Sequence, residues 1–165
     1  MKRPAAVSPR VLAVAVPVIA AGVFVFGLAI REYAAAPRSA RDLAELFGLF
    51  LVMALAERFP VQGEGVGANG VTLGFVFSVS AIILLGWPAG VIVAAGAPAV
   101  VHILQHRPPL RIAYNGSMFA LSAFAAGLAV EHLPGDSTEI LVARVVLCGF
   151  VYCVVNLVLI SAILA

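Results

Sequence analysis

The chain has 165 residues, of which 63% are hydrophobic and 11% are charged, and its formal net charge is +2. Ordinary soluble domains hold about 45–50% apolar and about 25% charged residues, so this composition leaves too little polar surface for a soluble domain. The small net charge also argues against a nucleic-acid partner. We therefore expect one membrane domain over residues 1–165, with the lipid bilayer as its main partner.

Six apolar stretches predict an all-α, polytopic membrane protein, a bundle of six transmembrane helices. A spanning helix needs about 20 apolar residues to cross roughly 30 Å of hydrocarbon, and residues 11–30 meet this without a charged side chain. The next stretches are 39–56, 71–85, 89–104, 112–130 and 140–165. A cleaved signal peptide is the alternative for the first, because Ala34, Ala35 and Ala36 could imitate a cleavage site. Its apolar core is longer than the 7–15 residues typical of signals.

Local signals mark where several of these helices start, turn or bend. Ser39 and Asp42 fit the [ST]-x-x-[DE] pattern of a helix start. Gly86, Trp87 and Pro88 predict a tight turn at a membrane interface, and Pro98 predicts a kink inside the fourth span.

Lysine and arginine in the short loops predict the orientation. With the N-terminus in the cytoplasm, six basic residues lie inside (Lys2, Arg3, Arg10, Arg58, Arg107 and Arg111) and three outside (Arg31, Arg38 and Arg41). The positive-inside rule therefore predicts that both termini are cytoplasmic. The last apolar stretch stops at Ala165 without a basic flank, so we expect a truncated C-terminus, with a cytoplasmic output domain missing.

Polar residues inside the spans are the candidate site residues, because polar groups in hydrocarbon need partners. Counting depth from the predicted helix ends gathers one cluster toward the cytoplasmic side: Thr72, His102, Tyr114, Asn115, Tyr152 and Asn156. We expect Asn115 and Asn156 to contact each other or share a partner, either as packing contacts between helices or as the wall of a pocket for an unknown small-molecule ligand. At the outer face, Glu45 and Arg144 could form an ion pair, or could act independently as a helix-capping and a snorkelling residue.

No pattern of catalytic, metal-binding or cofactor-binding residues stands out. The three histidines lie in different segments, and no serine or cysteine has a base beside it. Cys148 and Cys153 are rotated about 140° apart on a helix, which disfavours a shared metal or a local disulfide. Ala123 and Gly127 are small residues four apart, a spacing that favours close contact between helices. The same spacing could also form a homodimer motif, which is the weaker interpretation. We therefore expect no catalytic residues, no metal and no cofactor.

Several short strings resemble the N-terminal membrane region of bacterial HD-GYP and GGDEF signalling proteins. They are ERFPV at 57–61, VTLGFVF at 71–77, RPPLR at 107–111 followed by Tyr114 and Asn115, LSA at 121–123, and VVNL at 154–157. The resemblance covers roughly residues 43–165. It implies a multi-helix sensory or anchoring module in the bacterial inner membrane, attached to a domain that makes or degrades cyclic di-GMP. The catalytic motifs of those domains do not occur in this sequence, so the resemblance carries over no enzymatic activity.

A second resemblance is architectural. Six helices in this length, with the turn LLGWPAG at 84–90, look like the substrate-binding subunit of energy-coupling factor vitamin transporters. Such subunits bind a small molecule toward the outer side, whereas the polar cluster predicted here lies mostly toward the inner side. The transporter subunit is therefore the alternative function.

Overall fold

The computed structural model describes residues 8–59, 73–135 and 137–164, and in these residues it is entirely helical, without strands. The elements are α1 (Pro9–Ala35), α2 (Ala40–Arg58), α3 (Gly74–Leu85), α4 (Trp87–Val91), the π-helical η1 (Ile92–Gly96), α5 (Ala97–Leu104), α6 (Pro109–Glu131) and α7 (Thr138–Leu164). Because α4, η1 and α5 follow one another without a break, the described residues form six continuous helices, which confirms the predicted all-α class.

Four of these helices are long and apolar enough to cross a membrane: α1, the continuous helix Trp87–Leu104, α6 and α7. The other two of the six predicted spans fall short for different reasons. Helix α2 has 19 residues, but charged side chains occupy both of its ends. Helix α3 has 12 residues, which cover roughly 18 Å at 1.5 Å per residue.

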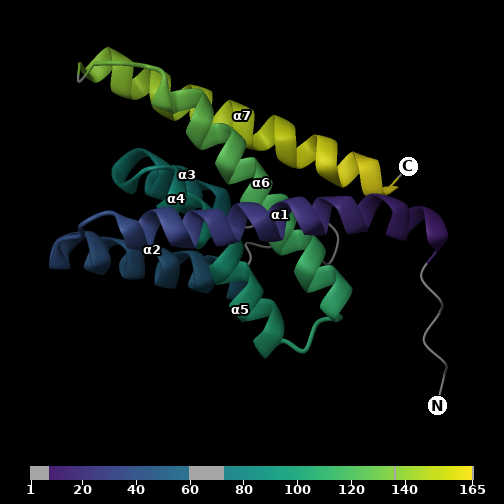
Figure 1. The fold of residues 1–165 in the computed structure, drawn as a ribbon. Helices are drawn as coiled ribbons and strands as arrows, with labels where there is room; N and C mark the ends of the chain where they lie inside the picture. The colour runs from purple at the N-terminus through teal and green to yellow at the C-terminus, as the bar shows by residue number, and fades with distance from the viewer. Residues whose placement is uncertain (1–7, 60–72, 136, 165) are drawn as a thin grey trace.

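Helix α6 crosses the middle of the molecule and contacts α1, α3, α4, η1, α5 and α7. Helix α2 is attached at the side, through α3, η1 and α5. The first turn of α1 and the last turn of α7 lie at the same end of the molecule, at the right of Figure 1. We call this the N-terminal end and the other the opposite end.

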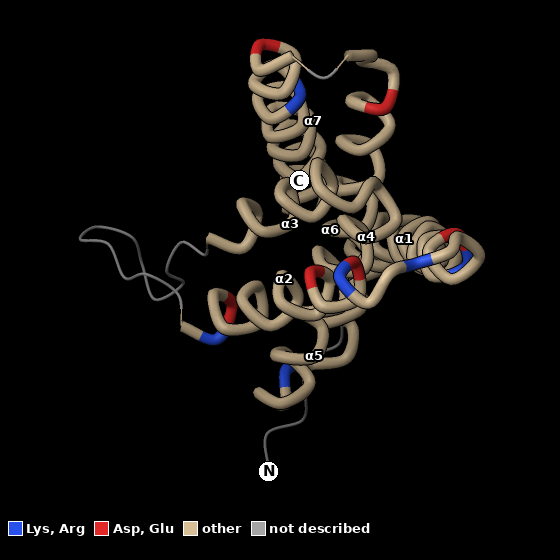
Figure 2. Tube along the Cα trace, turned by 90° about the vertical axis from the view of Figure 1, so that its left-hand side faces the viewer, with Lys and Arg blue, Asp and Glu red and all other residues tan. Residues whose placement is uncertain are grey.

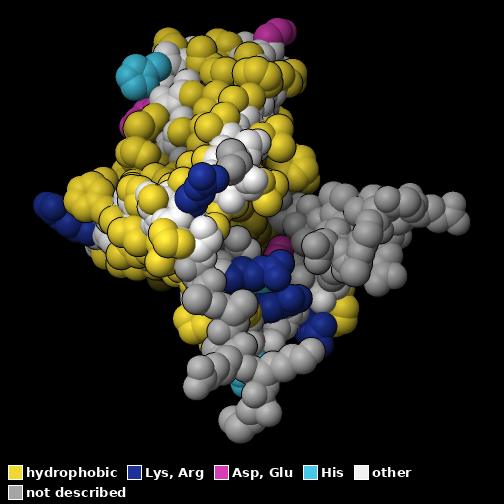
Figure 3. All heavy atoms as spheres, turned by 90° about the vertical axis from the view of Figure 1, so that its right-hand side faces the viewer, with side chains coloured by type: hydrophobic (Ala, Val, Ile, Leu, Met, Phe, Trp, Pro, Cys, Tyr) yellow, Lys and Arg dark blue, Asp and Glu magenta, His cyan; other side chains and the backbone are white. Residues whose placement is uncertain are grey.

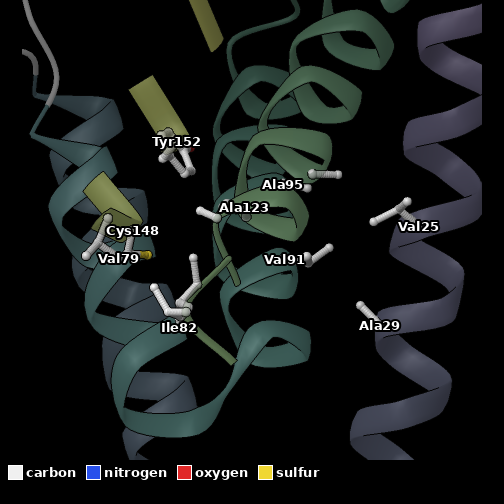
Figure 4. Packing of buried hydrophobic residues seen from close by; sticks show 13 residues of the cluster. Val25, Ala29, Val79, Ile82, Val91, Ala95, Ala123, Cys148 and Tyr152 are labelled. Carbon is white, nitrogen blue, oxygen red and sulfur yellow. The ribbon is translucent and has the colours of Figure 1, made fainter. Parts of the chain in front are cut away.

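The core consists mostly of small and β-branched side chains drawn from α1, α3, the helix 87–104, α6 and α7 (Figure 4). Helices α1 and α6 approach most closely at Gly22, where a Cβ would lie 2.2 Å from the Cβ of Ser117. The Ser117 hydroxyl donates to the Ile19 carbonyl at 3.3 Å. Gly127 packs against Trp87 in the same way, so the small residues noted at 123 and 127 make contacts within the chain. Such residues let membrane helices pack through their backbones.

Two local predictions, the helix start at Ser39 and the turn at Gly86, are confirmed. Ser39 and Asp42 form a reciprocal capping box at the start of α2. Gly86 takes φ +88° at the turn before Trp87, a conformation that glycine adopts without strain. The sequence predicts a kink at Pro98. In the structure the helix there contains a π-helical segment, η1, which ends at Gly96, two residues before the proline. A widened turn relieves the clash between a proline ring and the carbonyl four residues earlier.

Candidate functional site

A glutamate and a histidine pair between the last turns of α2 and α5. The Glu57 Oε1 atom lies 3.2 Å from His102 Nε2, and each side chain is only 12% exposed. Glu57 is the second-last residue of α2 and His102 is the third-last of α5, and these two helices pack against each other. Half-buried ionisable residues in an apolar helical bundle are uncommon and mark candidate functional sites.

The backbone after His102 is held in one conformation. His106 has φ 53°, which is rare for a residue other than glycine. Its N–H donates to the Ile103 carbonyl, and the N–H of Arg107 donates to the His102 carbonyl, both at 3.0 Å. These two bonds form a Schellman motif, which closes the end of α5 and fixes the helical turn that carries His102.

Glu57 also lines a cavity of about 360 Å³ between four helices. Its polar wall is formed by Glu57 from α2 and by Tyr152, Cys153 and Asn156 from α7. The apolar wall is formed by Met53, Phe75, Phe119, Leu157 and Ile160. Two buried atoms at this site, Asn156 Oδ1 and His102 Nδ1, have no hydrogen-bond partner within the described part of the chain. Because an unpaired buried polar atom costs about 1–3 kcal/mol, this arrangement is suited to a ligand that supplies hydrogen bonds.

The structure brings together three members of the predicted polar cluster. Tyr152 and Asn156 line the cavity, and His102 reaches it through Glu57. The Tyr114 hydroxyl instead donates to the Leu159 carbonyl at 2.6 Å and thereby links α6 to α7. Thr72 lies outside the described residues.

Asn115 and Asn156 do not form the predicted contact. They line different cavities. Asn115 shares its cavity with Arg111, Tyr114 and Leu164. The residue of α6 that lines the cavity of Asn156 is Phe119. Phe119 follows Asn115 by one helical turn, so the two antiparallel helices are offset by about one turn from the register that the depth count assumed. Asn156 Oδ1 therefore has no amide partner in α6.

The predicted ion pair between Glu45 and Arg144 is also absent from the described residues. Glu45 Oε1 lies 2.7 Å from Arg41 Nε, one turn earlier on α2. The Arg144 guanidinium donates through two nitrogens to the Leu133 carbonyl, which follows the end of α6. Both residues thus take a nearby partner, because such a contact orders less chain than an ion pair across helices would.

Sequence reasoning missed Glu57 as a site residue and read it only as a charge that ends the second apolar stretch. The predicted stretch ended at residue 56, whereas in the structure α2 continues to Arg58, so that Glu57 lies in its last turn as His102 lies in the last turn of α5. Within residues 8–59, 73–135 and 137–164, no three His, Cys, Asp or Glu side chains are grouped so that they could hold a metal ion.

Comparison of the chain with models of protein families, with curated proteins and with solved structures gave no match. The resemblances of the sequence to signalling and transporter membrane regions therefore remain expectations. The functional argument depends on the paired Glu57 and His102 and on the cavity beside them.

Proposed function

We propose that the chain is an integral membrane sensory or anchoring input module of a bacterial signalling protein, without catalytic activity of its own. One observation carries the proposal: a buried Glu57–His102 pair borders a cavity between apolar helices, and unpaired polar atoms lie at the same site. The cavity falls within the roughly 300–1,000 Å³ range of small-molecule sites. A chain that binds a ligand among membrane helices, and in which the first turn of α1 and the last turn of α7 lie at the same end, is suited to pass a signal to an attached domain.

The module is proposed to cross the bacterial inner membrane six times, with both termini in the cytoplasm. Figure 3, which views the molecule from the N-terminal end, shows blue Lys and Arg side chains gathered on this side. The opposite end, seen in Figure 2, carries acidic and basic residues together. This asymmetry supports a cytoplasmic N-terminal end under the positive-inside rule.

A crossing by α2 is supported by its outward face, despite the charges at its ends. Leu43, Phe47, Leu51 and Leu55 are all exposed, and their spacing of four places them in one stripe along the helix. A continuous apolar stripe facing water would be unfavourable, whereas facing lipid it is the expected surface. The charges at the two ends of α2 then lie at the two interfaces.

The proposal is tested by joining residues 1–165 to a cytoplasmic GGDEF domain and measuring cellular cyclic di-GMP. A sensory module predicts that Glu57→Gln changes the output, whereas Glu45→Gln, at the opposite end of the same helix, does not. An anchoring module predicts that neither variant changes it, but that removal of the membrane helices does. Hydrolysis of cyclic di-GMP by the purified chain, lost in His102→Ala, would contradict both.

The alternative is a small-molecule-binding membrane subunit resembling the substrate-binding component of energy-coupling factor vitamin transporters. The cavity favours this alternative as much as it favours a sensor, because its lining residues Phe119 and Tyr152 lie near the middle of α6 and α7 and therefore favour neither side of the membrane. The gene sequence after codon 165 separates the two. An HD-GYP or GGDEF domain in frame supports signalling, and a stop codon beside transporter ATPase genes supports the transporter subunit.

A further inference from the structure

We propose that the cavity beside Glu57 binds a small organic ammonium ion with an apolar body. The inference deepens the proposed function, since it names the class of ligand that the input module would sense. It is argued from the polar groups that line the cavity, from the charge left on Glu57 and from the apolar wall.

The polar groups call for a ligand that donates hydrogen bonds. His102 Nε2 contacts only one oxygen of the Glu57 carboxylate, Oε1. Asn156 lines the cavity, and its side-chain oxygen is buried and accepts nothing from the described residues. A protonated amine carries up to three N–H donors, and can therefore satisfy a carboxylate oxygen and an amide oxygen together.

The charge on Glu57 calls for a cation. His102 Nε2 lies 3.2 Å from Glu57 Oε1, and His102 Nδ1 is buried without a partner in the described residues. Within the described residues, no lysine or arginine nitrogen lies within 4 Å of the carboxylate. The guanidinium of the adjacent Arg58 lies over the Phe59 ring, 5.4 Å from its centroid. A cationic ligand would compensate the remaining negative charge, whereas an anion would be repelled by it.

The remaining wall selects an organic cation over a metal ion. Phe75 and Phe119 contribute aromatic rings, and Met53, Leu157 and Ile160 contribute aliphatic or thioether surface. Aromatic faces attract ammonium groups, and an apolar wall suits a hydrocarbon body. The hard cations Ca²⁺ and Mg²⁺ need six or more oxygen ligands, which this wall does not offer.

Three matched probes test the inference: benzylamine, benzyl alcohol and benzoate, which share a benzyl-sized body and differ in charge. Each is titrated at pH 7 against the chain in lipid nanodiscs, and the thermal midpoint is recorded. We expect a concentration-dependent rise with benzylamine alone, because a ligand that binds only the folded state stabilises it. Glu57→Gln should abolish the rise, and Glu45→Gln should retain it.

Asn156→Leu provides a second variant in case Glu57→Gln does not fold. It removes an unpaired buried oxygen, so it should fold at least as well as the parent and still lose most of the benzylamine shift. Equal shifts with all three probes would indicate apolar partitioning and would overturn the inference, as would preference for benzoate or the absence of any shift. These outcomes leave the fusion experiment with the GGDEF domain unaffected, so the failure of the ammonium site and the failure of the input module are distinguishable.

Discussion

The closest contact between α1 and α6 makes Gly22→Ala the sharpest test of the helix packing. A Cβ at Gly22 would lie 2.2 Å from Ser117 Cβ and 2.4 Å from Ser117 Cα. Carbon atoms in contact sit about 3.5–4.0 Å apart, so the helices would have to separate by roughly 1.3 Å or more. The backbone atom in this contact cannot move aside as a side chain could.

The expected loss of stability follows from three terms. Overpacking costs about 1–3 kcal/mol, and weakening the Ser117 hydroxyl bond to the Ile19 carbonyl adds about 0.5–1.5 kcal/mol. Alanine recovers about 1 kcal/mol through its higher helix propensity. We therefore expect Gly22→Ala to lower the free energy of unfolding by about 0.5–3.5 kcal/mol.

Gly27→Ala is the matched control, because nothing lies within 4 Å of a Cβ at Gly27 on the same helix. It should be neutral or stabilising by up to about 1 kcal/mol. Equilibrium unfolding in mixed micelles, with thermal unfolding in nanodiscs as a second measure, gives both values. A Gly22→Ala protein as stable as Gly27→Ala would refute the close packing of α1 on α6, and would also be the result if α1 were removed as a signal peptide.

Two further predictions concern the site and the end of α5. Leucine substitutions of Glu57 and His102 should show a coupling energy of about 0.6–2 kcal/mol in a double-mutant cycle, the range of interhelical hydrogen bonds; additive losses would contradict the pair. His106→Gly should raise the free energy of unfolding by about 0.5–1 kcal/mol, because it relieves the positive φ at the end of α5; a loss of stability would contradict that geometry.

The helices were predictable from the sequence because their ends carry chemical signals. The capping box at Ser39 fixes the start of α2, and Gly86 separates α3 from α4 by taking a positive φ. Apolar length alone was a weaker guide, since residues 71–85 were predicted as a span although the described helix α3 begins at Gly74. Both kinds of signal are local and require no knowledge of packing.

The candidate site was only partly predictable, because it depends on how helices are rotated and offset against one another. Depth counting grouped His102 with Tyr152 and Asn156, which the structure brings to one site. Depth alone does not give the face of a helix, so it wrongly paired Asn115 with Asn156. It also missed Glu57, whose partner follows 45 positions later and becomes visible only when α2 packs on α5.

The central claim is that six helices cross the membrane, with both termini in the cytoplasm. Cysteine accessibility tests it most directly, in a protein whose own cysteines, Cys148 and Cys153, are replaced by alanine. Single cysteines are introduced as Pro37→Cys, Arg58→Cys, Arg107→Cys and His132→Cys, and spheroplasts are treated with a membrane-impermeant maleimide before and after permeabilisation. We expect Pro37→Cys and His132→Cys to be labelled in intact spheroplasts, and the other two only after permeabilisation. Labelling of Arg58→Cys from outside together with Pro37→Cys would show that α2 does not cross, and would contradict the account.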